Sequence, residues 1–338
     1  MDNRIPVTLL TGFLGSGKTT LLNKLLTHPD MKNSAVIINE LGETGLDHIL
    51  AQNVESSYVA DNMVLLQSGC LCCTLSNELA DTMRDLFFKR AVEAIPQFNR
   101  LVIETTGMAD PGPILGNLMN EPVIESVYRL DAVVVTIDAV YGAQQIEDHN
   151  EARKQAAVAD VLLITKTDLA TGEQIATLKE KLHALNAGAT QHTVLHGEID
   201  PSLIIDAGLF DASGKQATPE RWLRTPLKPH TPKGTLPAKQ HSDEIESFTV
   251  TLPSGLNWQT FKPILLKLCQ THGEDLFRLK GILHCEDQAH PLAIHAVHFT
   301  PYPATPLVDW NETQPISRIV IICKNIDKNA VIDMLMQF

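Results

Sequence analysis

The chain has 338 residues, 44% of them hydrophobic, and this length is typical of two domains rather than one. Its formal net charge of −13 and the lack of a basic stripe argue against nucleic-acid binding. There is no secretory signal and no apolar run near the about 20 residues of a membrane span, so we expect a cytoplasmic protein without membrane contact.

Short apolar runs alternate with amphipathic stretches in the first two thirds of the chain. The runs do not alternate with polar residues, which is typical of strands buried on both faces of a parallel sheet. The expected strands are IPVTLL, AVIIN, MVLLQ, RLVIE, LDAVVVTID and ADVLLITK, and the expected helices are 18–27, 76–94, 144–159 and 171–186. This order predicts an α/β fold with the doubly wound, mostly parallel sheet of a P-loop NTPase.

The segment GFLGSGKT, residues 12–19, matches the phosphate-binding pattern G-x-x-x-x-G-K-[ST] between a strand and a helix. Its glycines let backbone N–H groups surround phosphates, while Lys18 is placed to reach the β- and γ-phosphates and Thr19 to bind Mg²⁺. We therefore assign catalytic roles to Lys18 and Thr19. The expected nucleotide-binding residues are Gly12, Gly15, Ser16, Gly17, Lys18, Thr19 and Thr20.

The segment INELGETGLD, residues 38–47, occupies the position of a switch loop that γ-phosphate and Mg²⁺ would order. We expect Glu40 to be a metal ligand and Glu43 to be a catalytic residue that positions water. A solvated acidic loop is the alternative interpretation.

The segment SGCLCC, residues 68–73, holds three of the six cysteines of the chain, Cys70, Cys72 and Cys73. In a cytosolic protein, adjacent cysteines indicate metal or redox chemistry more often than disulfides. Thiolates at this spacing suit Zn²⁺ best, with Cu(I) or Co²⁺ as alternatives, and three of them leave a tetrahedral shell incomplete, as in an exchangeable site. A redox switch and three buried apolar cysteines are the competing interpretations.

In RLVIETTG, Glu104 ends a predicted strand and is placed to hold Mg²⁺ or its water, while Gly107 is placed to sense the γ-phosphate. The alternative is a surface glutamate at the end of a strand.

The segment ITKTDL, with Lys166 and Asp168, looks like the guanine-reading N/T-K-x-D loop of GTPases, with Thr165 in place of the commoner Asn. A carboxylate there accepts hydrogen bonds from guanine that adenine does not offer, so we predict GTP rather than ATP. Asp168 as a helix N-cap is the alternative. In LHGEID, His196 either packs on the base or is an ordinary loop histidine.

The proposed domain limits are 1–210 for the nucleotide-binding domain, 211–244 for a linker rich in Pro, Gly, Lys and Thr, and 245–338 for a smaller α+β domain. The α+β domain is expected to contain helices at 258–271 and 327–338. A second metal site is conceivable in HCEDQAHPLAIHAVHF, at His284, Cys285, His290, His295 and His298. Against it, His295 and His298 would fall on opposite faces of a strand.

Together, TLLTGFLGSGKTTLLNKLL, NELGETGLD, GCLCC, RLVIETTGMADP and LLITKTD resemble the CobW family of P-loop GTPases of the SIMIBI class, in particular its YjiA-like branch. The segment DLFRLKGIL resembles the C-terminal domain of that family. The resemblance implies slow GTP hydrolysis, Zn²⁺ or Co²⁺ binding at C-x-C-C and a role in metal delivery or homeostasis. It favours Cys70 and Cys72 over Cys73 as ligands. Two features depart from the branch: Ile38 stands where a second acid is frequent, and the linker lacks a His-rich tract.

The sequence thus predicts a GTP-gated zinc or cobalt metallochaperone, an enzyme with low intrinsic GTPase turnover. Its expected ligands are GTP or GDP, Mg²⁺ and Zn²⁺, with Co²⁺ as the alternative metal. Its expected partner is an unidentified metalloprotein client, and it is a monomer or homodimer. The alternatives are a GTPase switch with a structural zinc and a P-loop kinase for a small molecule.

Overall fold

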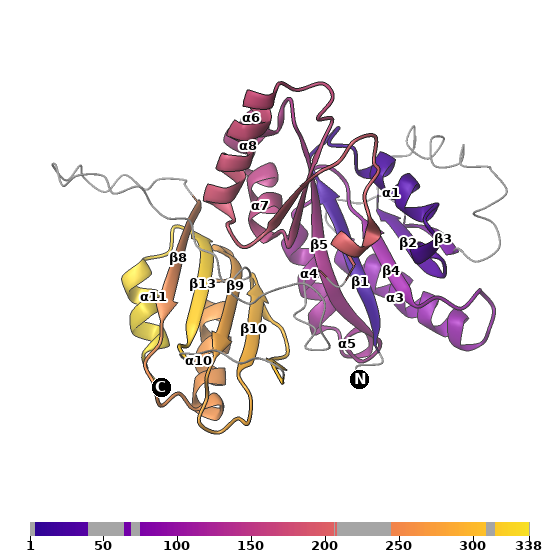
Figure 1. Cartoon of the computed structure of the whole chain (residues 1–338). Coiled ribbons are helices and arrows are strands. Elements are labelled where there is room, and N and C mark those ends of the chain that lie inside the picture. Colours follow the sequence, from indigo (N-terminus) through magenta and orange to yellow (C-terminus); the bar gives the residue numbers. More distant parts are fainter. Residues whose placement is uncertain are drawn as a thin grey trace. The chain divides into compact units, whose positions relative to one another are not determined.

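The computed structural model of the whole chain (Figure 1) describes residues 4–39, 64–68, 75–205, 207, 245–308 and 315–337. The chain divides into two compact units: the first holds Met1–Lys181 and Ala189–Leu209, and the second holds Leu182–Gly188 and Phe210–Phe338. Within the described ranges, we find no helix with the length and hydropathy needed to cross a membrane.

A parallel sheet forms the centre of the first unit. Over the described residues it has seven strands in the order β3-β2-β4-β1-β5-β6-β7, and every neighbouring pair is parallel. All these strands therefore end at one edge of the sheet, which is where ligands bind in open α/β folds. The strands are β1 (Ile5–Gly12), β2 (Ser34–Asn39), β3 (Val64–Ser68), β4 (Arg100–Glu104), β5 (Tyr128–Asp138), β6 (Val161–Thr165) and β7 (Thr190–Thr193).

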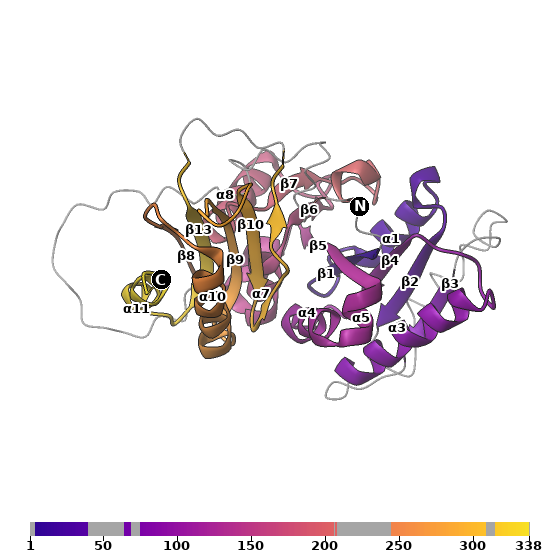
Figure 2. The ribbon, with the colours of Figure 1, turned by 90° about the horizontal axis from the view of Figure 1, so that it is seen from below.

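Helices cover both faces of this sheet, as Figure 2 shows. On one face, Leu21 and Leu25 of α1 (Lys18–Leu26) join the hydrophobic core together with Ile204, which follows the 3-10 turn Pro201–Leu203. Helices α3 (Leu75–Ala91), α4 (Pro111–Asn120), α5 (Pro122–Val127) and α7 (Asn150–Val158) cover the other face. The described residues also form α6 (Gly142–Asp148) and α8 (Gly172–Leu185). The expected doubly wound α/β fold is confirmed.

The prediction of one continuous helix over 144–159 is wrong. The chain forms α6 and α7 instead, because His149 between them is extended, with φ −122° and ψ 123°. Arg153 holds this break: its Nε donates to the carbonyl oxygen of Ile146 at 2.9 Å, and its Nη2 donates to that of Glu147 at 2.9 Å. A side chain from α7 thus satisfies carbonyls at the end of α6.

In the second unit, the described residues form an antiparallel sheet and two helices, which confirms the expected α+β class. Over the described residues, the strand order is β11-β10-β9-β13-β8, and β12 pairs with β10. Leu265 and Leu268 of α10 and Val331 of α11 share one hydrophobic core with the sheet residues Phe248 and Ile321. The elements are β8 (Ile245–Thr251), α10 (Trp258–His272), β9 (Leu276–Leu283), β10 (Leu292–Val297), β11 (Thr300–Pro301), β12 (Thr305–Pro306), β13 (Arg318–Lys324) and α11 (Lys328–Leu335).

The conceivable second metal site in this unit is not formed. His298 lies in the turn after β10, where its Nδ1 is 2.9 Å from the carbonyl oxygen of Gly273, and the ring of His295 stacks on Tyr302 with centroids 4.1 Å apart. Cys285 is buried in the core. Among the described residues, no group of three or more His, Cys, Asp or Glu side chains is placed to hold a metal ion.

Candidate functional site

The turn between β1 and α1 requires its glycines. Gly12 ends β1 with φ 145°, and a Cβ atom there would lie 2.4 Å from both the carbonyl oxygen and Oγ1 of Thr136 on β5. Gly15 and Gly17 have φ 72° and 93°, in the left-handed region that strains other residues. The loop can therefore pass close to β5 and still turn into the N-terminus of α1, where backbone N–H groups favour anions.

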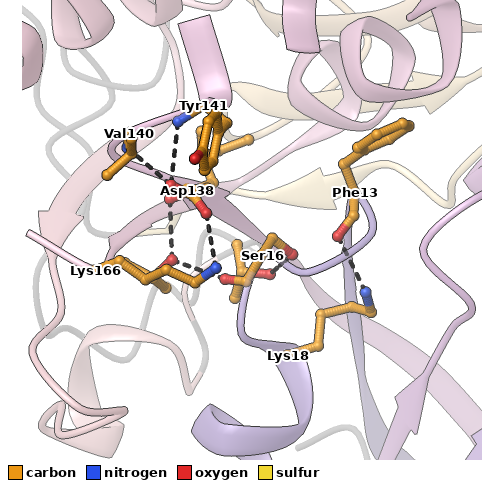
Figure 3. A network of polar contacts seen from close by, with 10 residues as sticks. Phe13, Ser16, Lys18, Asp138, Val140, Tyr141 and Lys166 are labelled. Atoms are coloured by element: carbon orange, nitrogen blue, oxygen red, sulfur yellow. Dashed lines mark hydrogen bonds and ion pairs between the residues drawn. The ribbon is translucent and has the colours of Figure 1, made fainter. Parts of the chain in front are cut away.

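Side-chain contacts hold this P-loop in place (Figure 3). The buried Ser16 Oγ lies 2.7 Å from Thr136 Oγ1, and the Ser16 amide donates to the carbonyl oxygen of Phe13 at 3.1 Å. Lys18 Nζ donates to the carbonyl oxygens of Gly12 at 2.9 Å and Phe13 at 3.3 Å. The ammonium group is thus kept inside the loop, beside the backbone that would surround phosphates.

Thr19 and Glu104 meet at the same edge of the sheet. Glu104 ends β4, the neighbour of β1, and is 2% exposed. Thr19 Oγ1 donates to Glu104 Oε1 at 2.9 Å. A hydroxyl and a carboxylate are hard oxygen donors of the kind that Mg²⁺ takes in phosphate sites. The donor set therefore fits Mg²⁺.

Gly107 lies against the P-loop. A Cβ atom on Gly107 would be 2.7 Å from both Cα and N of Leu14, so another residue here would push the two loops apart. The amide of Ala109 donates to the carbonyl oxygen of Thr106 at 3.1 Å, which makes 106–109 a tight turn. This turn, which begins two residues after Glu104, is thus in direct contact with the P-loop backbone.

The expected base-recognition loop follows β6. Lys166 has φ 53°, and its Nζ donates to Asp138 Oδ2 at 2.7 Å (Figure 3). Asp138 ends β5 and also accepts through Oδ1 from the amides of Val140 at 2.7 Å and Tyr141 at 3.2 Å. Asp168, two residues after Lys166, is exposed and available to a ligand.

The loop after β7 packs on α1. Gly197 has φ 78°, and a Cβ atom there would lie 2.8 Å from the carbonyl oxygen of Thr20. The neighbouring His196 is exposed and has φ 52°. This contact places His196 near the first turn of α1, the helix that follows the P-loop.

The structure therefore gathers the described candidates at the carboxyl edge of β1, β4, β6 and β7. Cys70, Cys72, Cys73, Glu40 and Glu43 lie outside the described residues. Sequence reasoning missed Thr136 and Asp138. The sequence does contain a signal for Asp138: the run VVVTID predicts a strand that ends in an acid, as RLVIE does at Glu104, and such an acid lies at the edge where ligands bind.

Comparisons with known proteins agree with this arrangement. The family model described as CobW/HypB/UreG, nucleotide-binding domain matches residues 6–193, and the model described as cobalamin synthesis protein cobW C-terminal domain matches residues 245–338.

Individual relatives match over most of the chain. The chain is 37% identical over 320 residues to the zinc chaperone YjiA of Escherichia coli (strain K12), which covers 95% of this chain and 94% of that protein. It is 29% identical over 307 residues to zinc-regulated GTPase metalloprotein activator 1 of Schizosaccharomyces pombe, covering 84% of this chain and 73% of that protein. The crystal structure of Zn(II)-bound YjiA GTPase from E. coli superposes with a TM-score of 0.71 at 31% identity, covering 98% of each chain. The P-loop, the acid on β4 and these matches lead to one conclusion: the chain belongs to the CobW/HypB/UreG family of nucleotide-binding proteins.

Proposed function

We propose that the protein is a GTP-binding, slowly GTP-hydrolysing metallochaperone whose bound nucleotide controls its affinity for Zn²⁺, with Co²⁺ as the alternative metal. The metal is cargo, held by Cys70 and Cys72 with Cys73 as a further ligand. The names of the relatives, a zinc chaperone and a zinc-regulated GTPase metalloprotein activator, support the same function.

The strand order is the observation that carries the proposal. Strand β2 lies between β3 and β4 in the sheet. The segment with Glu40 and Glu43 follows β2, the segment with the three cysteines follows β3, and β4 ends at Glu104. The segment that γ-phosphate would order therefore starts from the strand that lies between the one ending in the Mg²⁺ ligand and the one leading to the thiols.

The described residues have separate roles in this proposal. Lys18 would exchange the carbonyl oxygens of Gly12 and Phe13 for the β- and γ-phosphates, and the amides of the P-loop would hold the same groups. Asp168 would accept from guanine. Thr19 and Glu104 would hold Mg²⁺, which when bound offsets negative charge on the phosphates.

Metal uptake is coupled to the release of protons from the cysteine thiols. Cysteine binds Zn²⁺ as the thiolate, so binding releases protons. Coupling between two sites in one protein is typically about 1–3 kcal/mol, or about 5- to 150-fold in affinity. We expect Zn²⁺ to bind more tightly when a GTP analogue is bound, and hydrolysis to loosen it.

Chelator competition on metal-free protein tests the proposal. The Zn²⁺ affinity is measured without nucleotide, with GDP and with a non-hydrolysable GTP analogue, each with Mg²⁺, beside Cys72→Ala and Asp168→Asn. We expect the GTP analogue to tighten Zn²⁺ binding at least about tenfold. Cys72→Ala should remove the tight binding itself, whereas Asp168→Asn should remove only the effect of nucleotide.

Equal Zn²⁺ affinity in all three nucleotide states would overturn the gated carrier and leave a GTPase with structural zinc. Phosphate transfer from GTP to a small hydroxyl compound would point instead to a kinase.

The finer assignments belong to the same proposal. They are the division into 1–210, 211–244 and 245–338, a cytoplasmic location, a metalloprotein client and a monomeric or homodimeric state. Size-exclusion chromatography with light scattering, with and without the GTP analogue, distinguishes the two oligomeric states.

A further inference from the structure

Helix α7 and the residue before it contact two parts of the nucleotide site, the P-loop and the turn at 106–109. The ring of His149 stacks on the ring of Phe13 in the P-loop, with centroids 4.6 Å apart and an interplanar angle of 25°. His149 lies at the break between α6 and α7, where its backbone is extended.

Gln155 of α7 holds the turn after Glu104. Its side chain is fully buried, and Nε2 donates to the carbonyl oxygens of Gly107 at 3.2 Å and Ala109 at 2.9 Å. Both hydrogens of the amide are used, and the two carbonyls fix which end of the amide faces the turn. Rotation of the peptide after Gly107 would break one of these bonds.

Lys154 adds a second tie between α7 and the same region. Its Nζ lies 2.6 Å from Oδ2 of Asp110, whose Oδ1 accepts from the amide of Gly112 and caps α4. Gly107 itself has contacts on two sides. Its carbonyl oxygen accepts a hydrogen bond from Gln155 of α7, and its Cα packs closely against the backbone of Leu14 in the P-loop.

We propose that Gln155 is a positioning residue for GTP hydrolysis, which fixes the turn at Gly107 against the P-loop so that the turn meets the γ-phosphate. The inference rests on the proposed function, because it assigns the turn the γ-phosphate of GTP. His149 acts on the other loop through Phe13. The two side chains therefore affect different parts of the nucleotide: His149 affects every nucleotide, and Gln155 affects only the one with a γ-phosphate.

Gln155→Met tests this assignment, since methionine keeps the length of the side chain and removes both donors. The turn loses both hydrogen bonds that hold it, so we expect kcat for GTP to fall about tenfold or more. The affinity for GDP should stay within about threefold of the original protein, because GDP has no γ-phosphate. The preference for a GTP analogue over GDP should fall about fivefold or more.

Two matched variants separate positioning from general loss of structure. Gln144→Met makes the same replacement at an exposed position of α6, and kcat should not change. His149→Ala should weaken GDP and the GTP analogue equally, while His149→Phe, which keeps a ring to stack on Phe13, should restore both. Lys154→Met removes only the partly exposed ion pair, so it should fold even if Gln155→Met does not, and it should lower kcat with GDP affinity unchanged.

An unchanged kcat and unchanged nucleotide preference in folded Gln155→Met would overturn the inference, and so would equal weakening of GDP and the GTP analogue. If Gln155→Met does not fold, unchanged kcat in Lys154→Met overturns it. These outcomes differ from failure of the proposed function, in which the original protein itself does not hydrolyse GTP.

Discussion

The hydroxyl group of Thr165 donates a hydrogen bond to the carbonyl oxygen of Ser16, with 2.7 Å between the oxygens, and joins residues 149 positions apart. Thr165 begins the expected base-recognition loop and Ser16 lies inside the P-loop. The same hydroxyl is 3.2 Å from the carbonyl oxygen of Ile137. The base loop and the phosphate loop are therefore connected directly, by the residue that replaces the commoner Asn.

Thr165→Val should weaken nucleotide binding. Valine has the same shape but no hydroxyl, so the buried carbonyl of Ser16 loses its donor, at a cost of about 1–3 kcal/mol. We expect affinity for GDP and for a GTP analogue to fall equally, by about tenfold, in titration calorimetry. Thr167→Val in the same loop is the control and should bind normally. A loss confined to the GTP analogue would contradict this account.

Asp138→Asn should loosen the base-recognition loop. The change removes the charge that pairs with Lys166 at 2.7 Å, while the amide oxygen still accepts from Val140 and Tyr141. Asp138 is buried but Lys166 is partly exposed, so we expect a loss of about 1–2 kcal/mol, or about 5- to 30-fold in GTP affinity. Competition of GTP against labelled GDP measures this loss of affinity. Unchanged affinity would mean that the ion pair does not position the loop.

Native thiol labelling should separate the cysteines into two groups. Cys269, Cys285 and Cys323 are buried in the second unit, and burial raises the pKa of each thiol to about 12. Since the thiolate is the reactive form, these three should resist iodoacetamide near neutral pH. We expect mass spectrometry to find label only on Cys70, Cys72 and Cys73, and Zn²⁺ to protect them. Rapid labelling of Cys269 or Cys323 would show that the core opens easily.

The second unit should lose stability in alkali. Burial raises the pKa of Cys269 and Cys323 from an ordinary value of 9.0 to about 12, and Glu246 and Asp275 add to the rise at Cys323. Between these pH values the unfolded chain releases thiol protons that the folded chain keeps. The free energy of unfolding is therefore highest below about pH 9 and falls as pH rises, by at most about 1.4 kcal/mol per pH unit for each thiol.

Urea unfolding at pH 7.5, 9.5 and 10.5 with reductant measures this decline. Cys269→Ala is the control: it should be less stable at pH 7.5, because it leaves a small cavity, but its stability should decline less steeply with pH. Equal slopes in both proteins would contradict a raised pKa at Cys269.

Periodicity and motif spacing predicted most of the first unit. The segments IPVTLL and RLVIE became β1 and β4, and the helix expected at 171–186 is α8. The break at His149 was not predictable in this way, since no Gly or Pro marks it and its causes are a ring in the P-loop and the side chain of Arg153. Helices α4 and α5 were also missed. Each begins with a proline after an acidic N-cap, Asp110 and Glu121, but each is too short for its apolar periodicity to predict a helix.

The motifs likewise predicted the P-loop, Glu104 and the Thr165 loop, because each needs only a strand end and a fixed spacing. The contacts between these residues and their partners were not predictable, although its place at a strand end marks Asp138 as a candidate. Thr136, Asp138 and Gln155 come from segments without a motif, and only the fold brings them to Ser16, Lys166 and Gly107.

The close approach of Gly197 to Thr20 determines where a nucleotide-binding fragment can be cut. The family match to the nucleotide-binding domain ends at residue 193, yet Gly197 packs on α1, and Val194 and Ile204 lie in the same hydrophobic core as Leu21 and Leu25. A fragment that stops at 193 would leave that side of the first helix exposed to water and prone to aggregate. Expression of the isolated first unit should therefore extend at least through Ile205.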